Sequence, residues 1–266
     1  MTKNYVLFVV LLGLSFSSFG QSPWVDNKGS IYLQGSRNSI NYTSIFNNTG
    51  GTSQNDFETS DRTFSLYGSY SITNRTGVLV NLPYKSVRVD TLSLSALGDL
   101  SIKVKHQLGT KMPLAIYAGY TAPTATREGA LRTGFDQHSV DLGLSTGFTL
   151  EQVFGYVGAG YRYRANIPNQ FIIEAELGTS SKIGKRELFI IFHIDGAINF
   201  REVEDPEASE SVLYHNNGQF VSPGIKFSLG IAKNLFINFG GYGAFTATSQ
   251  GAGASVSLGI AYNMKK

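Results

Sequence analysis

Apolar and polar residues alternate along this chain in segments far longer than an ordinary strand. In the stretch ELFIIFHIDGAINF, residues 187–200, every second residue belongs to the same face of an extended chain. One face carries Leu188, Ile190, Phe192, Ile194, Ile198 and Phe200, and the other carries Phe189, Ile191, His193, Asp195, Ala197 and Asn199. Strands of soluble proteins are usually about 5 to 6 residues long, whereas a tilted strand that crosses a bilayer needs about 9 to 11. The length of this segment therefore predicts a transmembrane strand.

Twelve alternating segments follow one another from residue 30 onward. They cover residues 30–36, 63–73, 77–89, 97–109, 114–124, 138–150, 153–166, 170–184, 187–203, 220–233, 235–248 and 254–265. Short turns alternate with longer loops, which cover residues 47–62, 91–96, 125–137, 167–169, 204–219 and 249–253. Outer-membrane barrels have an even number of strands and this alternation of connections. We predict an all-β fold, a transmembrane antiparallel up-and-down β-barrel of twelve strands, with both termini on the periplasmic side.

A soluble β-sandwich is the main structural alternative, because it also has many alternating strands. The last segment argues against a sandwich, since its bulky positions alternate with small residues that suit the wall of a narrow lumen. The small set is Ser255, Ser257, Gly259, Ala261 and Asn263. Outward aromatic residues also fall near strand ends, where barrels have aromatic girdles. They are Tyr84, Tyr120, Tyr161, Tyr163 and Phe200 at the loop ends, and Tyr70, Phe148 and Tyr262 at the turn ends.

The first 20 residues have the pattern of a secretory signal peptide. Lys3 precedes an apolar stretch over residues 5–14, and small and hydroxylated residues lead to a cleavage site after Gly20. The alternative, an N-terminal membrane helix, would need about 20 apolar residues. We expect residues 1–20 to be the signal peptide and residues 21–266 to form the barrel, in the outer membrane of a Gram-negative cell.

Composition limits the possible partners. The chain has no Cys, which excludes a disulfide scaffold and a lipidated N-terminus. After removal of Lys3 with the signal peptide, 21 basic and 19 acidic residues remain, a balance that gives no case for nucleic-acid binding. The expected partners are outer-membrane lipids, a small solute and the barrel-assembly machinery during biogenesis.

Charged residues occupy inward positions on neighbouring segments, in the half of the barrel nearer the loops. They are Asp141, Arg162, Arg164, Glu174, Glu176, His193 and Asp195. Adjacent acids and bases at one level can satisfy one another. They would either form a structural network that fills a narrow lumen, or also line or gate a solute route, with His193 adding sensitivity to pH.

No arrangement of residues indicates catalysis or metal binding. A lipid hydrolase of this size would need a Ser, a His and an orienting group together on a lipid-facing strand end. None of the four histidines, His106, His138, His193 and His215, has such neighbours at a suitable spacing. With no Cys and no His pair at ligand spacing, a metal site is not expected either. We therefore predict no enzyme, no catalytic residues, no cofactor and no metal.

Several short motifs resemble the family known as the MetA-pathway of phenol degradation, outer-membrane barrels grouped loosely with fatty-acid transporters. The motifs are YGSYSITNR at 67–75, LPY at 82–84, LGDLSIKVK at 97–105 and AGYTAPT at 118–124. The resemblance covers most of the chain after the signal peptide, and implies passage of small hydrophobic or aromatic compounds. Physically, Gly98 could supply a bend where Asp99 turns inward, with Lys103 and Lys105 on the same face. These three charged residues are predicted to line the lumen, and wall filling is their alternative role.

These observations together predict a passive channel or transporter for a small solute, hydrophobic or aromatic by the family resemblance. The alternative is a closed barrel with a structural or surface-interaction role, suggested by the number of inward side chains. An outer-membrane lipid hydrolase is the third possibility, and the histidine positions disfavour it.

Overall fold

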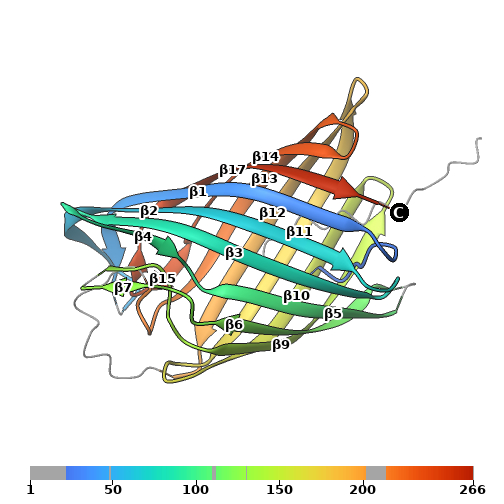
Figure 1. The fold of residues 1–266 in the computed structure, drawn as a ribbon. Helices are drawn as coiled ribbons and strands as arrows, with labels where there is room; N and C mark the ends of the chain where they lie inside the picture. Colours follow the sequence, from blue (N-terminus) through green and yellow to red (C-terminus); the bar gives the residue numbers. More distant parts are fainter. Residues whose placement is uncertain (1–21, 48, 110–111, 130, 202–213, 266) are drawn as a thin grey trace, which may run out of the picture.

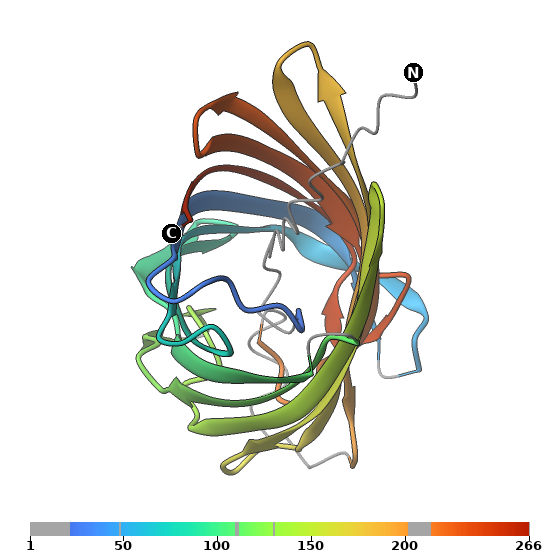
Figure 2. The same cartoon turned by 90° about the vertical axis from the view of Figure 1, so that its right-hand side faces the viewer.

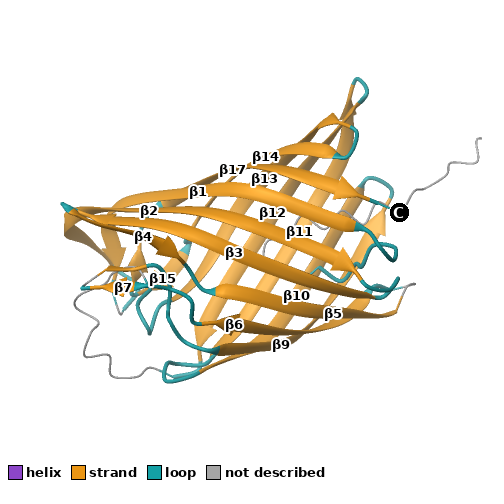
Figure 3. Cartoon of the chain, in the orientation of Figure 1, coloured by secondary structure: helices purple, strands orange, loops and turns teal. Residues whose placement is uncertain are grey.

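The computed structural model describes residues 22–47, 49–109, 112–129, 131–201 and 214–265, and these form one closed barrel (Figure 1). Its wall consists of twelve strands: β1 Ile31–Phe46, β2 Thr52–Ser71, β3 Thr76–Val89, β5 Leu100–Gly109, β6 Leu114–Ala122, β9 Ser139–Leu150, β10 Val153–Arg164, β11 Gln170–Ile183, β12 Arg186–Asn199, β13 Gln219–Ala232, β14 Leu235–Gly243 and β17 Ala254–Met264. Figure 3 shows strands and loops throughout the described part. The predicted signal peptide lies outside the described residues.

Each wall strand pairs with its neighbours in the sequence, and all these pairings are antiparallel. The last strand closes the barrel on the first, with β17 and β1 in register from Ile31 opposite Met264 to Ile40 opposite Ser255. The number of strands and their order confirm the fold that was predicted from the alternation. Among the described residues, no helix is long and apolar enough to cross a membrane.

The predicted loop 47–62 is wrong, because β1 and β2 continue as a paired hairpin well beyond the rest of the wall. Their register runs on to Phe46 opposite Thr52. At the tip, Asn47 Oδ1 accepts hydrogen bonds from the backbone N–H of Thr49 and Gly51, at 3.0 and 2.9 Å. The β2 part of this extension, residues 52–61, is mostly polar, so it lacks the alternation by which the strands within a bilayer are recognised.

Three smaller elements also differ from the predicted connections. β4, Leu92–Leu97, folds back on β3 in the segment predicted as a loop, so the next wall strand begins at Leu100 and not at residue 97. The segment predicted as one strand over 235–248 is divided, because β15, Thr246–Thr248, pairs with β13 after β14 has ended. The long loop 125–137 contains a short hairpin of β7, Arg127–Glu128, and β8, Leu131–Arg132.

The two faces of the wall differ as the alternation requires. All eight predicted girdle aromatics are exposed on the outer surface, together with apolar side chains such as Leu142, Phe192 and Leu258. Inward residues of the same strands are buried, and one apolar cluster fills the end of the barrel nearer the short turns. Its members are Tyr32, Phe189, Ile191, Phe236 and Ala261, with Tyr67 and Phe154 packed against them.

Candidate functional site

The inner face of the wall carries the predicted charged residues at buried positions. Strand alternation on β9 to β12 points them inward, away from the outer apolar side chains. The exposed fraction is 2% for Glu174, 3% for His193 and 4% for Arg164. Burying charges at this depth is costly unless each one is paired or hydrogen-bonded. Their partners therefore describe how the lumen is organised.

The two arginines of β10 have different partners. Arg162 makes a bidentate pair with Asp141 of β9, with Nε 2.7 Å from Oδ1 and Nη2 2.9 Å from Oδ2. Arg164 lies one inward position nearer the loops. Its Nε donates to the Pro168 carbonyl at 2.6 Å, and its Nη2 lies 3.3 Å from both Asn199 Oδ1 and the Asn216 carbonyl. Arg162 is therefore satisfied within the wall, whereas Arg164 holds segments that cross the loop end.

A second group of charges lies on β11, β12 and β13. Glu176 pairs with Lys226 at 2.9 Å, and His193 Nδ1 lies 3.0 Å from Asp195 Oδ2. Glu174 accepts a hydrogen bond from the Tyr156 hydroxyl of β10. The His193 Nε2 atom is buried and has no hydrogen-bond partner within the described part of the chain.

Lys103 and Lys105 of β5 have different surroundings from Asp99, which lies in the loop before β5. Lys103 lies over the ring of Tyr117, 4.6 Å from its centroid. Lys105 is buried, and its Nζ donates to the Ser22 carbonyl at 2.9 Å. Asp99 lies between β4 and β5 and accepts hydrogen bonds from three backbone N–H groups of the 125–137 loop, the shortest at 2.8 Å from Phe135. Lys103 and Lys105 therefore belong to the lumen, while Asp99 anchors a loop at its rim.

In the middle of the lumen the charges gather on one part of the wall, from β5 to β13, whereas Asp61 and Lys85 form an ion pair of 3.8 Å at the loop end of β2 and β3. The opposite part, from β14 through β17 and β1 to β2, has uncharged polar side chains at its inward middle positions. Asn238 and Gln34 are examples, and they lie 3.4 Å apart. Any solute in the middle of the lumen would contact ionic groups on one side and amides or hydroxyls on the other.

A segment outside the wall closes the turn end. Residues 22–30 run inside the ring of strands, as Figure 2 shows along the barrel from the turn end. Trp24 packs edge-on against Tyr156, with ring centroids 6.0 Å apart, and the Val25 N–H donates to Gln107 Oε1 at 3.4 Å. Asp26 lies 3.7 Å from Lys265, and burial raises the pKa of its carboxyl above the ordinary value. Together with the apolar cluster, this segment fills the turn half of the lumen.

A second segment, residues 214–218, crosses the loop end. The Tyr214 hydroxyl donates to Asp61 Oδ2 at 2.5 Å, and Lys85 lies over the Tyr214 ring, 4.3 Å from its centroid. Burial raises the pKa of Tyr214 well above its ordinary value, so the phenol stays protonated and keeps its role as donor. At the other end of the segment, Gln170 donates to the Gly218 carbonyl at 3.2 Å. These contacts fasten one segment to strands on both sides of the mouth.

Several residues of the site were not predicted. Lys226 and Tyr156 occupy inward positions, so the alternation of β13 and β10 could have identified them. Trp24 and Tyr214 carry no such signal, because they lie in irregular segments whose positions depend on tertiary contacts. No group of three or more His, Cys, Asp or Glu residues in the described part of the chain could hold a metal ion.

Comparison with known proteins gives a fold and no family. No protein-family model matches the chain. No curated protein matches it. An outer membrane channel from Pseudomonas putida F1 matches with a TM-score of 0.69 at 14% identity, covering 93% of this chain and 99% of that chain. The translocator domain of the autotransporter NalP from Neisseria meningitidis matches with a TM-score of 0.52 at 12% identity, covering 89% of each chain.

At these identities the matches show the fold alone, which is that of an outer-membrane β-barrel. The resemblance of the short motifs to the MetA-pathway family remains a prediction, since no family model matches.

Proposed function

We propose that this protein is a passive channel of the outer membrane for small solutes, with both termini on the periplasmic side, and that it is not an enzyme. The observation that carries the proposal is the way the lumen is closed. Segments 22–30 and 214–218 lie across its two ends, and neither segment is part of the wall.

The two closing segments are held less strongly than the wall. This difference would allow the lumen to open while the barrel stays folded. The wall is held by continuous ladders, such as the twelve paired positions between β9 and β10. Each closing segment is held by separate contacts, which include hydrogen bonds, ion pairs and packing, and not by a continuous ladder, and a typical hydrogen bond contributes about 1 kcal/mol net. Displacing one closing segment would therefore cost far less than opening the wall.

The solute we propose is small, with an aromatic or hydrophobic body. The motif resemblance supports this class. The lumen lining adds a polar requirement, because a solute would pass the rings of Tyr117 and Tyr156 and also the charges of Arg162 and Glu176. A ring that carries one polar or ionised group would suit both surfaces better than a plain hydrocarbon.

A reversible lock on the 22–30 segment tests the proposal. The protein has no Cys, so an added pair is the only possible disulfide. Val25→Cys with Gly77→Cys is a suitable pair, since a Cβ at Gly77 would lie 3.8 Å from Val25 Cγ1. The measurement is conductance in a planar bilayer and uptake of a small aromatic acid into liposomes. We expect both to be low in the oxidised protein and to recover when it is reduced.

Each single cysteine variant is the matched control, because it changes the packing but cannot form the bond. Equal flux through the oxidised and reduced double variant would refute the role of this segment as a movable closure.

The second candidate is a closed barrel with a structural or surface-interaction role. It is favoured by the dense filling of the turn end, where Phe189, Ile191 and Phe236 are all buried. The experiment would select this candidate if neither the folded wild-type protein nor the Trp24→Ala variant passed ions or the aromatic acid.

A further inference from the structure

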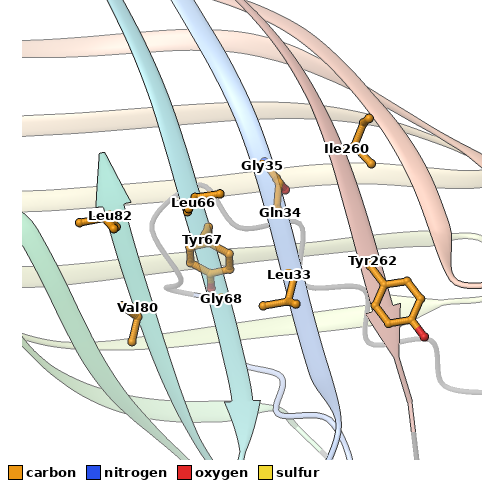
Figure 4. Close-up of a pocket in the computed structure, with 10 residues that line it drawn as sticks. All are labelled: Leu33, Gln34, Gly35, Leu66, Tyr67, Gly68, Val80, Leu82, Ile260 and Tyr262. Atoms are coloured by element: carbon orange, nitrogen blue, oxygen red, sulfur yellow. The ribbon is translucent and has the colours of Figure 1, made fainter. Parts of the chain in front are cut away.

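The outer surface of the wall has an apolar hollow of about 630 Å³ over β17, β1, β2 and β3 (Figure 4). It forms where two outward positions, Gly35 and Gly68, have no side chain. Six outward apolar residues surround these glycines: Leu33, Leu66, Val80, Leu82, Ile260 and Tyr262. Gln34 and Tyr67, which belong to the inner face, complete the lining. The hollow has the size and polarity to hold part of a hydrocarbon chain.

Two arginines lie on the loop side of this hollow. Arg37 follows Gly35 on the outer face of β1, and Arg62 lies two outward positions beyond Leu66 on β2. The register places Arg37 opposite Phe64 and Arg62 opposite Ser39, so the arginines are diagonal neighbours. Diagonal positions on one face of a sheet are about 7–8 Å apart, a separation at which two guanidinium groups can contact one phosphate.

Neither arginine has an acidic partner among the residues whose side chains the structure describes. Both side chains are exposed, and neither makes an ion pair or hydrogen bond within the described part of the chain. A third arginine, Arg88, projects from β3 one outward position beyond Ser86, which is opposite Arg62. On β10 and directly after β12, the outward positions near the loops carry Tyr161, Tyr163 and Phe200 instead. Arg37, Arg62 and Arg88 therefore lie on β1, β2 and β3, which also form the hollow.

An arginine on the lipid-facing side of a barrel costs about 2–4 kcal/mol at the bilayer midplane and much less near the interface. On the outer face Arg37 follows Gly35 and Arg62 follows Phe64, and the next outward residues toward the loops are Ser39 and Ser60, so the two arginines lie where the apolar band of β1 and β2 ends. At that level the surrounding molecules present phosphate groups, which arginine binds in bidentate geometry.

We infer that β1, β2 and β17 bind one phosphorylated glycolipid of the outer leaflet, with an acyl chain in the Gly35–Gly68 hollow and a sugar phosphate on Arg37 and Arg62. This inference rests on the proposed placement of the loops outside the cell, and it does not depend on conduction. The hollow and the two arginines are both needed for selective binding. The hollow alone would bind any hydrocarbon chain, and the arginines alone would bind any anion.

Native mass spectrometry of the detergent-solubilised full chain tests the inference. The probe is diphosphoryl lipid A, and dephosphorylated lipid A and phosphatidylglycerol are the comparisons. We expect diphosphoryl lipid A to bind best, with one molecule per chain. Binding should weaken about tenfold or more in the double variant Arg37→Gln, Arg62→Gln, because two charge-assisted contacts are lost.

Two further variants separate the halves of the site. Gly35→Leu fills the hollow, and its Cβ would have room, since the nearest atom is Phe64 Cζ at 3.8 Å. We expect it to weaken all acylated ligands, with the arginines still present. Arg75→Gln with Lys185→Gln removes the same charge at the turn end and should leave binding unchanged.

The inference fails if dephosphorylated lipid A binds as well as the diphosphoryl form, or if the turn-end variant loses as much binding as Arg37→Gln, Arg62→Gln. Unchanged lipid binding in Gly35→Leu with reduced uptake of an aromatic solute would also overturn it, and would assign the hollow to a lateral solute route. A dimer that Gly35→Leu dissociates would instead assign the hollow to a second copy of this chain.

Discussion

Tyr117 lies across the inner wall in a space that two glycines provide. A Cβ built at Gly143 or at Gly160 would overlap the Tyr117 hydroxyl oxygen. These glycines are opposite each other on β9 and β10, so together they form a flat patch for the ring. The same ring supports Lys103, whose Nζ lies over it. Two residues without side chains therefore help to place a cation in the lumen.

Gly160→Ala should destabilise the barrel, because the added methyl group forces Tyr117 out of its place. Overpacking of this kind costs about 1–3 kcal/mol, measurable as a lower midpoint of urea unfolding in lipid vesicles. Gly35→Ala is the control, since its Cβ would meet no atom closer than 3.8 Å. Adding Tyr117→Phe should restore much of the loss. If it does not, the clash lies with the Leu142 carbonyl rather than with the hydroxyl.

The buried Glu176 pairs with Lys226, a cation of the next strand but one, at 2.9 Å. Lys226→Met removes that partner and leaves a carboxylate of which 3% of the side chain is exposed. Leaving a buried charged group unpaired costs about 1–3 kcal/mol or more. The double variant Glu176→Gln, Lys226→Met should recover part of this loss, because both charges of the pair are removed together. A double-mutant cycle on unfolding free energy measures the coupling, and purely additive losses would show that the pair contributes nothing.

Among the elements, the wall strands could be predicted from the sequence because a bilayer imposes one strict pattern on them. Each strand from β9 to β12 has an apolar outer face, and the alternation also places Arg162, Glu174 and His193 on the inner face. The β1–β2 extension is beyond that constraint, since the β2 part is mostly polar and has no regular alternation. The alternation was therefore informative only within the predicted membrane, and the strand ends outside it were wrong.

The 214–218 segment is an element that such a pattern cannot place. Tyr214 is bound to Asp61 and Lys85, more than a hundred positions earlier in the chain, and only the closed barrel brings them together. Tyr214→Phe removes the hydroxyl and both hydrogen bonds while keeping the ring. We expect higher conductance and faster proteolysis at the loop end, with an unchanged unfolding midpoint.

Tyr163→Phe removes a hydroxyl from the outer girdle and serves as the matched control for Tyr214→Phe. An unfolding midpoint that falls in Tyr214→Phe but not in Tyr163→Phe would show that the segment is a structural part of the barrel rather than a closure.

At the scale of the whole molecule, a closed wall surrounds a lumen that is filled in three levels. Aromatic and aliphatic side chains and the 22–30 segment fill the turn end, charges occupy the middle, and the 214–218 segment crosses the loop end. The sequence predicted the middle level because it belongs to the wall. The two end levels depend on segments without periodicity, and their burial is decided by tertiary contacts.

The middle level separates the two candidate functions most directly. Neutralising Arg162, Arg164 and Glu174 with Gln removes two cations and one acid. In a channel, these charges act on the passing solute, so ion selectivity and the flux of charged aromatic solutes should change together. In a closed barrel they act on each other, and Asp141 would lose its bidentate partner in the Arg162 variant. That barrel should show a lower unfolding free energy and no change in flux.

Solute flux and urea unfolding should therefore be measured on the same three variants. The two measurements together show whether these charges act on a passing solute or stabilise the barrel. Arg62→Gln on the outer face provides a variant with the same change in charge as either arginine variant and no contact with the lumen.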